Sequence, residues 1–168
     1  MENILLHTCC GICGFSATQN LEKSFNIKYY WYNPNIHLVS EYKKRLDSAK
    51  TKFTFIIDTY DWKKWFLRIK NIAYNNIERC KECYIMRLTK TAEKAKELKI
   101  NNFSSTLLIS PYQKHDLLKN IGEDLQKRFN VKFHYFDERK NFYKYRNQYR
   151  EFGLYMQKYC GCVFSKPR

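Results

Sequence analysis

The sequence predicts an α/β fold, a single domain in which helices flank a mostly parallel sheet. Three observations lead to this prediction. Short apolar runs alternate with longer helical patterns along the whole chain, a spacing typical of βαβ units. Only five glycines and three prolines occur in 168 residues, which argues against a turn-rich β fold and against long linkers. The length suits one domain with a substantial core, so residues 1–168 are expected to form a single unit.

Five apolar or aromatic runs are expected to form the strands, at residues 4–6, 27–32, 53–57, 103–109 and 131–136. The second run, IKYYWY, is typical of a strand buried on both faces. Helices are expected from about residue 15 to 24, at 39–52, after Asp61, from Cys80 onward, at 117–129 and at 139–150. In the helix after Cys80, apolar residues recur on one face. This order of elements predicts a Rossmann-like arrangement of the HUP or PP-loop type.

The composition is strongly basic and rich in aromatic residues. The formal charge is +15, from 31 Lys and Arg against 16 Asp and Glu, and aromatic residues make up 17% of the chain. One interpretation is a genome biased toward lysine. The other is a polyanionic partner, since such a positive field raises both encounter rate and affinity.

The sequence predicts a cytoplasmic protein without a membrane partner. No stretch approaches the roughly 20 apolar residues needed to cross a bilayer. The first apolar run is short and no basic region precedes it, so we expect no signal peptide. In a reducing compartment, seven cysteines indicate metal or redox chemistry rather than structural disulfides. Disulfides between them are expected only in the absence of metal.

All seven cysteines fall into three clusters at the ends of predicted elements: Cys9, Cys10 and Cys13; Cys80 and Cys83; Cys160 and Cys162. The first cluster lies between a strand and a helix, where open α/β sheets place their chemistry and where free N–H groups favour thiolates. Because adjacent side chains diverge in a strand, Cys9 and Cys10 are expected to face different partners, with Cys13 returning to the same place. Four thiolates complete a zinc or iron–sulfur site, and three remain for a second metal. A single zinc with spare thiols is the alternative.

Residues 139–150 (RKNFYKYRNQYR) contain five basic residues and no acidic one. A helix here would place Phe142 and Tyr149 on one side, and Tyr143 and Arg146 on another. One interpretation is a core side and a solvated side. The other is an RNA-binding stripe that contacts phosphates and stacks bases, for which the candidate residues are Arg139, Lys140, Tyr143, Arg146 and Arg150.

Five motifs together resemble the QueH type of epoxyqueuosine reductase over nearly the whole chain. They are His7-x-Cys9-Cys10-x-x-Cys13, Tyr32-Asn33-Pro34-Asn35-Ile36-His37, Arg79-Cys80-x-x-Cys83-Tyr84, residues 105–112 (STLLISPY) and Tyr159-Cys160-Gly161-Cys162. Two departures stand out. Gly11-Ile12 replaces the usual Ala-Pro, and residues 156–158 (MQK) lack the arginine usual before the last motif. Lys158 or Arg150 is the expected substitute for that arginine.

The resemblance implies a metal-binding catalytic domain that removes the epoxide oxygen of epoxyqueuosine at a tRNA wobble position, giving queuosine-tRNA. It implies a 4Fe–4S cluster and an adjacent mononuclear metal, which we expect to be iron. The expected cofactor ligands are Cys9, Cys10, Cys80, Cys83, Cys160 and Cys162, and Cys13 completes the metal-binding set. The expected partners are the tRNA anticodon stem-loop and an electron donor such as a ferredoxin or flavodoxin.

Reducing an epoxide to an alkene takes two electrons and two protons and releases water. His7, Tyr112 and Asp58 are the candidate catalytic proton donors. A buried, hydrogen-bonded histidine and a helix cap are the alternative interpretations of His7 and Asp58.

Two other function classes fit parts of the pattern. One is a zinc-stabilised RNA-binding module without chemistry. The other is a cluster-dependent tRNA sulfur transferase on a related fold. A sulfur transferase is expected to have a Ser-Gly-Gly-x-Asp-Ser loop for ATP after the first strand, where this chain has Cys9-Cys10-Gly11-Ile12-Cys13.

Overall fold

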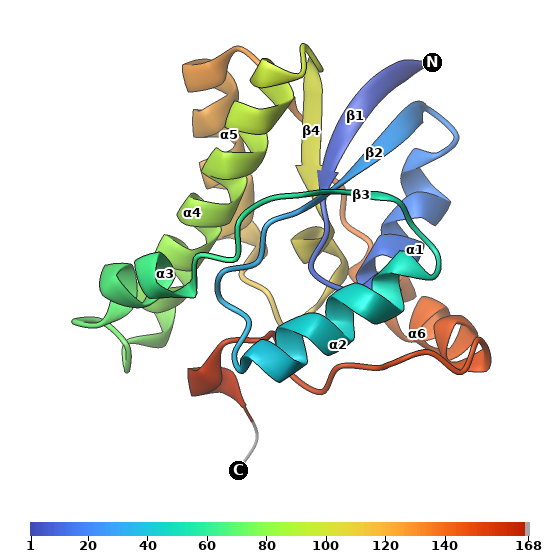
Figure 1. The fold of residues 1–168 in the computed structure, drawn as a ribbon. Helices are drawn as coiled ribbons and strands as arrows, with labels where there is room; N and C mark the ends of the chain where they lie inside the picture. Colours follow the sequence, from blue (N-terminus) through green and yellow to red (C-terminus); the bar gives the residue numbers. More distant parts are fainter. Residues whose placement is uncertain (167–168) are drawn as a thin grey trace.

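One five-stranded sheet, with strand order β3-β2-β1-β4-β5, forms the centre of the protein (Figure 1). The computed structural model describes residues 1–166. Every pair of neighbouring strands is parallel. The strands are β1 (Glu2–His7), β2 (Phe25–Trp31), β3 (Phe55–Ile57), β4 (Asn102–Ser105) and β5 (Lys132–Phe133). The predicted α/β fold with a parallel sheet is confirmed.

Within residues 1–166, six α-helices flank the sheet on both faces. They are α1 (Gly11–Leu21), α2 (Val39–Lys50), α3 (Trp62–Ile69), α4 (Asn76–Glu97), α5 (His115–Phe129) and α6 (Phe142–Glu151). Short 3-10 helices lie at Thr106–Ile109, Arg139–Asn141 and Val163–Ser165. Figure 1 shows α4 and α5 on one side of the sheet and α1 on the other. Within residues 1–166, none of the helices combines the length and apolar character that crossing a bilayer requires.

Alternation along β1 explains the two layers of helices. Leu5 packs with Phe103 and with Leu88 of α4 in the larger core cluster. Its neighbours Ile4 and Leu6 pack on the opposite face, in the cluster that contains Ala17 of α1. Successive side chains of a strand point to opposite faces, so a fully apolar strand needs helices on both sides.

The order of the strands reverses at β1. The chain leaves β1 for β2 and β3 on one side, and later returns to β4 and β5 on the other. His7, the last residue of β1, is in register with Ser105, the last residue of β4. The crevice beyond the carboxyl ends of two such strands is where open α/β sheets bind ligands. Cys9 and Thr106 follow directly at this point.

Several predicted boundaries are wrong. The strand expected at 131–136 covers only Lys132–Phe133, and the first helix begins at Gly11 rather than at about residue 15. Two of the errors reflect side-chain capping. The strand expected at 103–109 ends at Ser105, whose hydroxyl accepts a hydrogen bond from the N–H of Leu107 and caps the 3-10 helix that follows. The helix expected to open at Cys80 begins earlier, at Asn76. Asn75 caps it by accepting hydrogen bonds from the N–H groups of Ile77 and Glu78.

Candidate metal centre

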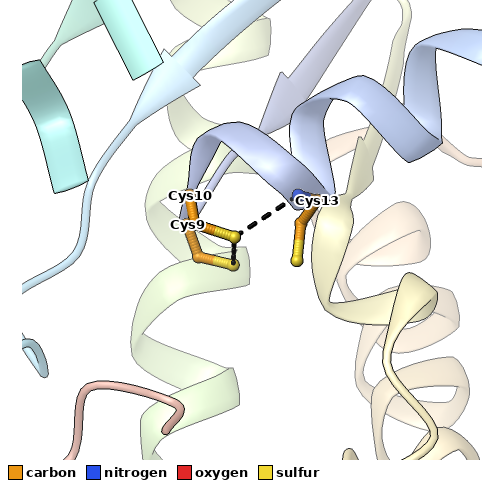
Figure 2. Close-up of side chains that lie close together, drawn as sticks. All are labelled: Cys9, Cys10 and Cys13. Atoms are coloured by element: carbon orange, nitrogen blue, oxygen red, sulfur yellow. Dashed lines mark hydrogen bonds between the residues drawn. The ribbon is translucent and has the colours of Figure 1, made fainter. Parts of the chain in front are cut away.

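The first cysteine cluster lies at the amino end of α1. Cys10 is the N-cap residue, and its Sγ accepts a hydrogen bond of 3.4 Å from the N–H of Cys13. The three sulfur atoms of Cys9, Cys10 and Cys13 lie within 4.8 Å of one another (Figure 2). The chain turns from strand to helix at the cap, and the Sγ atoms of Cys9 and Cys10 are only 3.9 Å apart, so the two side chains do not diverge. That they serve different metals stays a prediction. The expected return of Cys13 to the same place is confirmed.

The second cluster lies on α4. Cys80 is half-buried and Cys83 is buried, and both lie early in the helix rather than at its start. Because residues three apart share a face of a helix, the two thiols point to the same side. Cys83 packs in the main core with Trp65 of α3.

The third cluster lies in the segment after α6, which runs back along α2 (Figure 1). Buried Arg45 of α2 fixes this segment by donating hydrogen bonds to the carbonyl oxygens of Tyr159, at 2.9 Å, and Cys160, at 3.2 Å. Gly161, between the two cysteines, has φ of +108°, and a Cβ there would lie 2.7 Å from the side chain of Ile36. The Cys-Gly-Cys motif therefore requires its glycine.

Cysteines of all three clusters line one cavity of about 540 Å³, here called the cysteine cavity. The thiol-bearing residues in its wall are Cys9, Cys13, Cys80, Cys160 and Cys162. Its other lining residues include Arg79, Thr106, Tyr112, Lys114, Tyr143, Arg146, Gln157, Lys158 and Tyr159. Cys10 and Cys83 are buried beside it. The Sγ of Cys10 accepts a hydrogen bond of 2.7 Å from the amide of Gln157, and that of Cys83 lies 3.9 Å from Nη1 of Arg87.

The thiols of the site differ in acidity. Hydrogen bonds with the thiols of Cys10 and Cys13 hold the pKa of Cys9 well below its usual value, and the charge of Arg87 adds to this effect. A hydrogen bond from Cys162 lowers the pKa of Cys160 to about 5, helped by a contact of 2.8 Å with the hydroxyl of Ser165. Burial and neighbouring thiols raise the pKa of the other five thiols, those of Cys10, Cys13, Cys80, Cys83 and Cys162. Cys9 and Cys160 are therefore the thiols that lose their protons most readily, and thiolate sulfur suits zinc and iron–sulfur clusters.

The three predicted proton donors occupy different places. Tyr112 lines the cysteine cavity and is exposed, with its hydroxyl 2.9 Å from that of Tyr143. His7 is fully buried between Ser105 and the carbonyl oxygen of Tyr32, at 2.9 and 3.1 Å. Burial, with the nearby charge of Arg87, lowers its pKa to about 3, so His7 is uncharged at neutral pH.

Asp58 lies at the end of β3, outside the residues that line the cysteine cavity. It accepts hydrogen bonds from the hydroxyl of Tyr30 and the N–H of Thr59. Burial works to raise the pKa of Asp58, but these hydrogen bonds prevail and hold it below the usual value. The cap of α3 is Asp61, which accepts from the N–H of Lys64.

The predicted RNA-binding stripe divides in the structure. Tyr143 and Arg146 line the cysteine cavity. Lys140 and Arg150 are exposed away from its wall, and exposed Arg139 pairs with Asp137, with Nε 2.8 Å from Oδ1. Phe142 and Tyr149 are buried, as expected for the core side of this helix.

Three further residues belong to the site although no role was predicted for them from the sequence: Lys114, Gln157 and Arg87. Lys114 and Gln157 line the cavity, and Arg87 lies beneath it. Lys158, one of the two expected substitutes for the missing arginine, lines the cavity, whereas Arg150 does not. The signals in the sequence were their neighbours: Arg87 lies three residues after the motif that ends at Tyr84, Lys114 follows residues 105–112, and Gln157 lies within residues 156–158.

The sheet is all-parallel, and thiols from three segments gather near the point where its strand order reverses. The molecule is therefore an α/β protein with a cysteine cluster that could bind a metal. The family described as "Epoxyqueuosine reductase QueH" matches residues 4–168. The chain belongs to this family, whose members are named as oxidoreductases, and the predicted resemblance is confirmed.

Individual relatives agree with this assignment. A Dehalococcoides mccartyi protein named epoxyqueuosine reductase QueH is 39% identical to this chain, and the match covers 97% of this chain and 92% of the relative. A Thermotoga maritima protein of the same name is 33% identical, and the match covers 98% of this chain and 91% of the relative. The Streptococcus pyogenes protein of that name is 32% identical over 97% of this chain and 70% of its own length. These matches favour the reductase over the RNA-binding module and the sulfur transferase.

Proposed function

We propose that this protein is an epoxyqueuosine reductase, which removes the epoxide oxygen of epoxyqueuosine in a tRNA anticodon and leaves queuosine. The observation that carries the proposal is the cysteine cavity, whose wall combines thiols from three segments with exposed tyrosines and basic side chains. The relatives bear the name of this activity. A tRNA substrate would place the reaction in the cytoplasm.

The thiols are the proposed ligands of two centres. Four thiolates would hold a 4Fe–4S cluster, and the remaining three would frame a mononuclear metal, proposed to be iron. All seven cysteines, Cys9, Cys10, Cys13, Cys80, Cys83, Cys160 and Cys162, belong to this set. When bound, the cluster would supply electrons one at a time and the second metal would polarise the epoxide oxygen.

The rim of the cavity is the proposed tRNA contact. Lys114, Arg146 and Lys158 would contact phosphates of the anticodon loop, and the exposed ring of Tyr143 offers a face for a base. The modified base has to leave the stack of the loop to reach the thiols, as in other enzymes that act on bases. Arg139, Lys140 and Arg150 would contribute at longer range, through the overall positive field.

Among the three predicted proton donors, Tyr112 is the proposed catalytic residue, because it is the one of the three that lines the cavity. Tyr143, whose hydroxyl is within hydrogen-bond distance, can hold that proton in place. His7, uncharged and bonded through both ring nitrogens, would position the strand ends beneath the cysteines. Asp58 would anchor Tyr30.

The test is the conversion of tRNA that carries epoxyqueuosine by protein purified and reconstituted with iron and sulfide without oxygen, using a chemical reductant. A ferredoxin or flavodoxin is the proposed natural electron donor and is not required for this assay. Mass spectrometry of the nucleosides should show the loss of one oxygen, dependent on the metal. Equal conversion by metal-free protein would contradict the proposed mechanism. A protein that stays colourless after reconstitution and only binds tRNA would favour the zinc-stabilised module.

A further inference from the structure

Arg87 of α4 lies buried directly beneath the cysteine cavity, with 2% of its surface exposed. Its guanidinium donates a hydrogen bond of 2.9 Å from Nη2 to Oδ1 of Asn33. Its Nε lies 3.4 Å from Nε2 of His7, and its Nη1 lies 3.9 Å from Sγ of Cys83. None of these three neighbours is a carboxylate, and the third is a thiol.

A second buried arginine, Arg45, shows what Arg87 lacks. Arg45 is also 2% exposed, and its Nε lies 2.7 Å from a carboxylate oxygen of Glu41. Within residues 1–166, no carboxylate forms an ion pair with Arg87. A buried charge without a partner is strongly destabilising, so proteins pair such groups. The nearest groups that can become anionic are thiols, with Cys83 in contact and Cys9 close enough to interact electrostatically.

We propose that Arg87 is the buried counter-cation of the metal centre, whose positive charge balances thiolate ligands that include Cys83. This inference rests on the proposed metal-binding role of the cysteines. A centre built from several thiolates is anionic, and a fixed positive charge beneath it favours the bound metal. The same charge favours the reduced, more negative state of an electron-transfer centre and therefore raises its reduction potential. Arg87 is thus a positioning and charge-balancing residue rather than a catalytic one.

The test compares Arg87→Gln, which removes the charge, with Arg87→Lys, which keeps it. Arg68→Gln is the control, because it removes one positive charge from α3 at an exposed pair with Glu82. The first readout is the affinity of the metal-free protein for Zn²⁺, measured by competition with a chelator. We expect Arg87→Gln to weaken binding about 10-fold or more, Arg87→Lys to recover most of it, and Arg68→Gln to leave it unchanged.

Two further readouts separate charge balance from simple packing. Without metal, Arg87→Gln should not lower the melting temperature, since it removes an unbalanced buried cation, whereas with Zn²⁺ it should lower it. In reconstituted protein the midpoint potential of the cluster should become more negative in Arg87→Gln and return toward the wild-type value in Arg87→Lys.

The inference would be overturned if Arg87→Gln destabilised the metal-free and metal-bound forms equally and left the Zn²⁺ affinity unchanged. Arg87 would then have a role in packing alone. Failure of the wild-type protein to bind metal through its thiols would overturn the proposed metal centre itself. The Zn²⁺ measurement needs neither tRNA nor turnover, so it distinguishes these two failures.

Discussion

The floor and the rim of the cysteine cavity are built in opposite ways. The floor is taken here as the layer behind the lining residues, where Cys10, Cys83, His7 and Arg87 are buried and bonded to one another or to main chain. At the rim, Tyr112 is 73% exposed and Tyr143 is 60% exposed. Buried polar groups with complete partners are rigid, whereas exposed side chains remain free to adjust to a ligand. The floor therefore suits fixed chemistry, and the rim suits binding of a large, charged substrate.

Changes at the floor should have the largest effects. We expect single Cys→Ser changes at the seven positions to fall into two groups. Loss of a cluster ligand should bleach the visible absorption and destabilise the fold, because metal binding is coupled to folding. Loss of a ligand of the second metal should leave the spectrum largely intact and abolish reduction of the epoxide. If all seven variants kept both colour and activity, the two-centre assignment would be wrong.

Tyr112→Phe is a change at the rim that should affect the reaction rather than binding. It keeps the ring and removes the hydroxyl that is proposed to deliver a proton, so turnover should fall about 100-fold while tRNA affinity stays within about 3-fold. Single-turnover rates and filter-binding titrations measure the two quantities separately. Tyr143→Phe is the matched control, because it removes the hydroxyl that contacts Tyr112, and it should lower turnover less than Tyr112→Phe does. An unchanged rate in Tyr112→Phe would remove Tyr112 from the mechanism.

Changes to the rim charges should weaken binding without touching the metal. Replacing Lys114, Arg146 and Lys158 together with Gln should reduce tRNA affinity and lower the slope of log affinity against log salt by about 2, since each lost phosphate contact lowers it by about 0.7 to 0.9. The matched control replaces Arg139, Lys140 and Arg150, which are exposed outside the cavity wall. A larger slope change in the control would move the tRNA interface away from the rim.

The smallest effect is expected at Asp58, which lies outside both regions. Asp58→Asn should lower the free energy of unfolding by about 1 kcal/mol at neutral pH, because it weakens the hydrogen bond from Tyr30, and should leave turnover unchanged. The pKa of Asp58 is lower in the folded protein than its usual value, so its stabilisation is present above about pH 4 and is lost as the pH falls further. Denaturant titrations of both proteins at several pH values measure this. A loss of turnover would return Asp58 to the catalytic residues.

Local sequence patterns were sufficient for the fold because burial of a parallel sheet imposes continuous apolar strands. The run at 27–32 lies mostly in β2, where Tyr30 and Trp31 are buried although Lys28 is exposed, and the apolar face after Cys80 lies in α4. The position of the first cysteine cluster followed from the same logic, since it comes directly after β1.

The details that the sequence did not provide depend on capping and on contacts between distant segments. The close approach of Cys9 and Cys10 occurs where the chain turns from β1 into α1 at the helix cap. The hydrogen bond between Gln157 and Cys10 joins residues from opposite ends of the chain. The burial of Arg87 without a carboxylate could be recognised only once α4, β1 and the loop after β2 were placed together.

The most direct test of the account is the visible spectrum and the iron and sulfide content of protein purified without oxygen. The thiols around the cysteine cavity predict a coloured protein with iron in excess of the four atoms of one cluster, and with sulfide in proportion to that cluster. Protein that stays colourless after anaerobic reconstitution, or that holds only zinc, would contradict the central claim that this cavity is built for a redox metal centre.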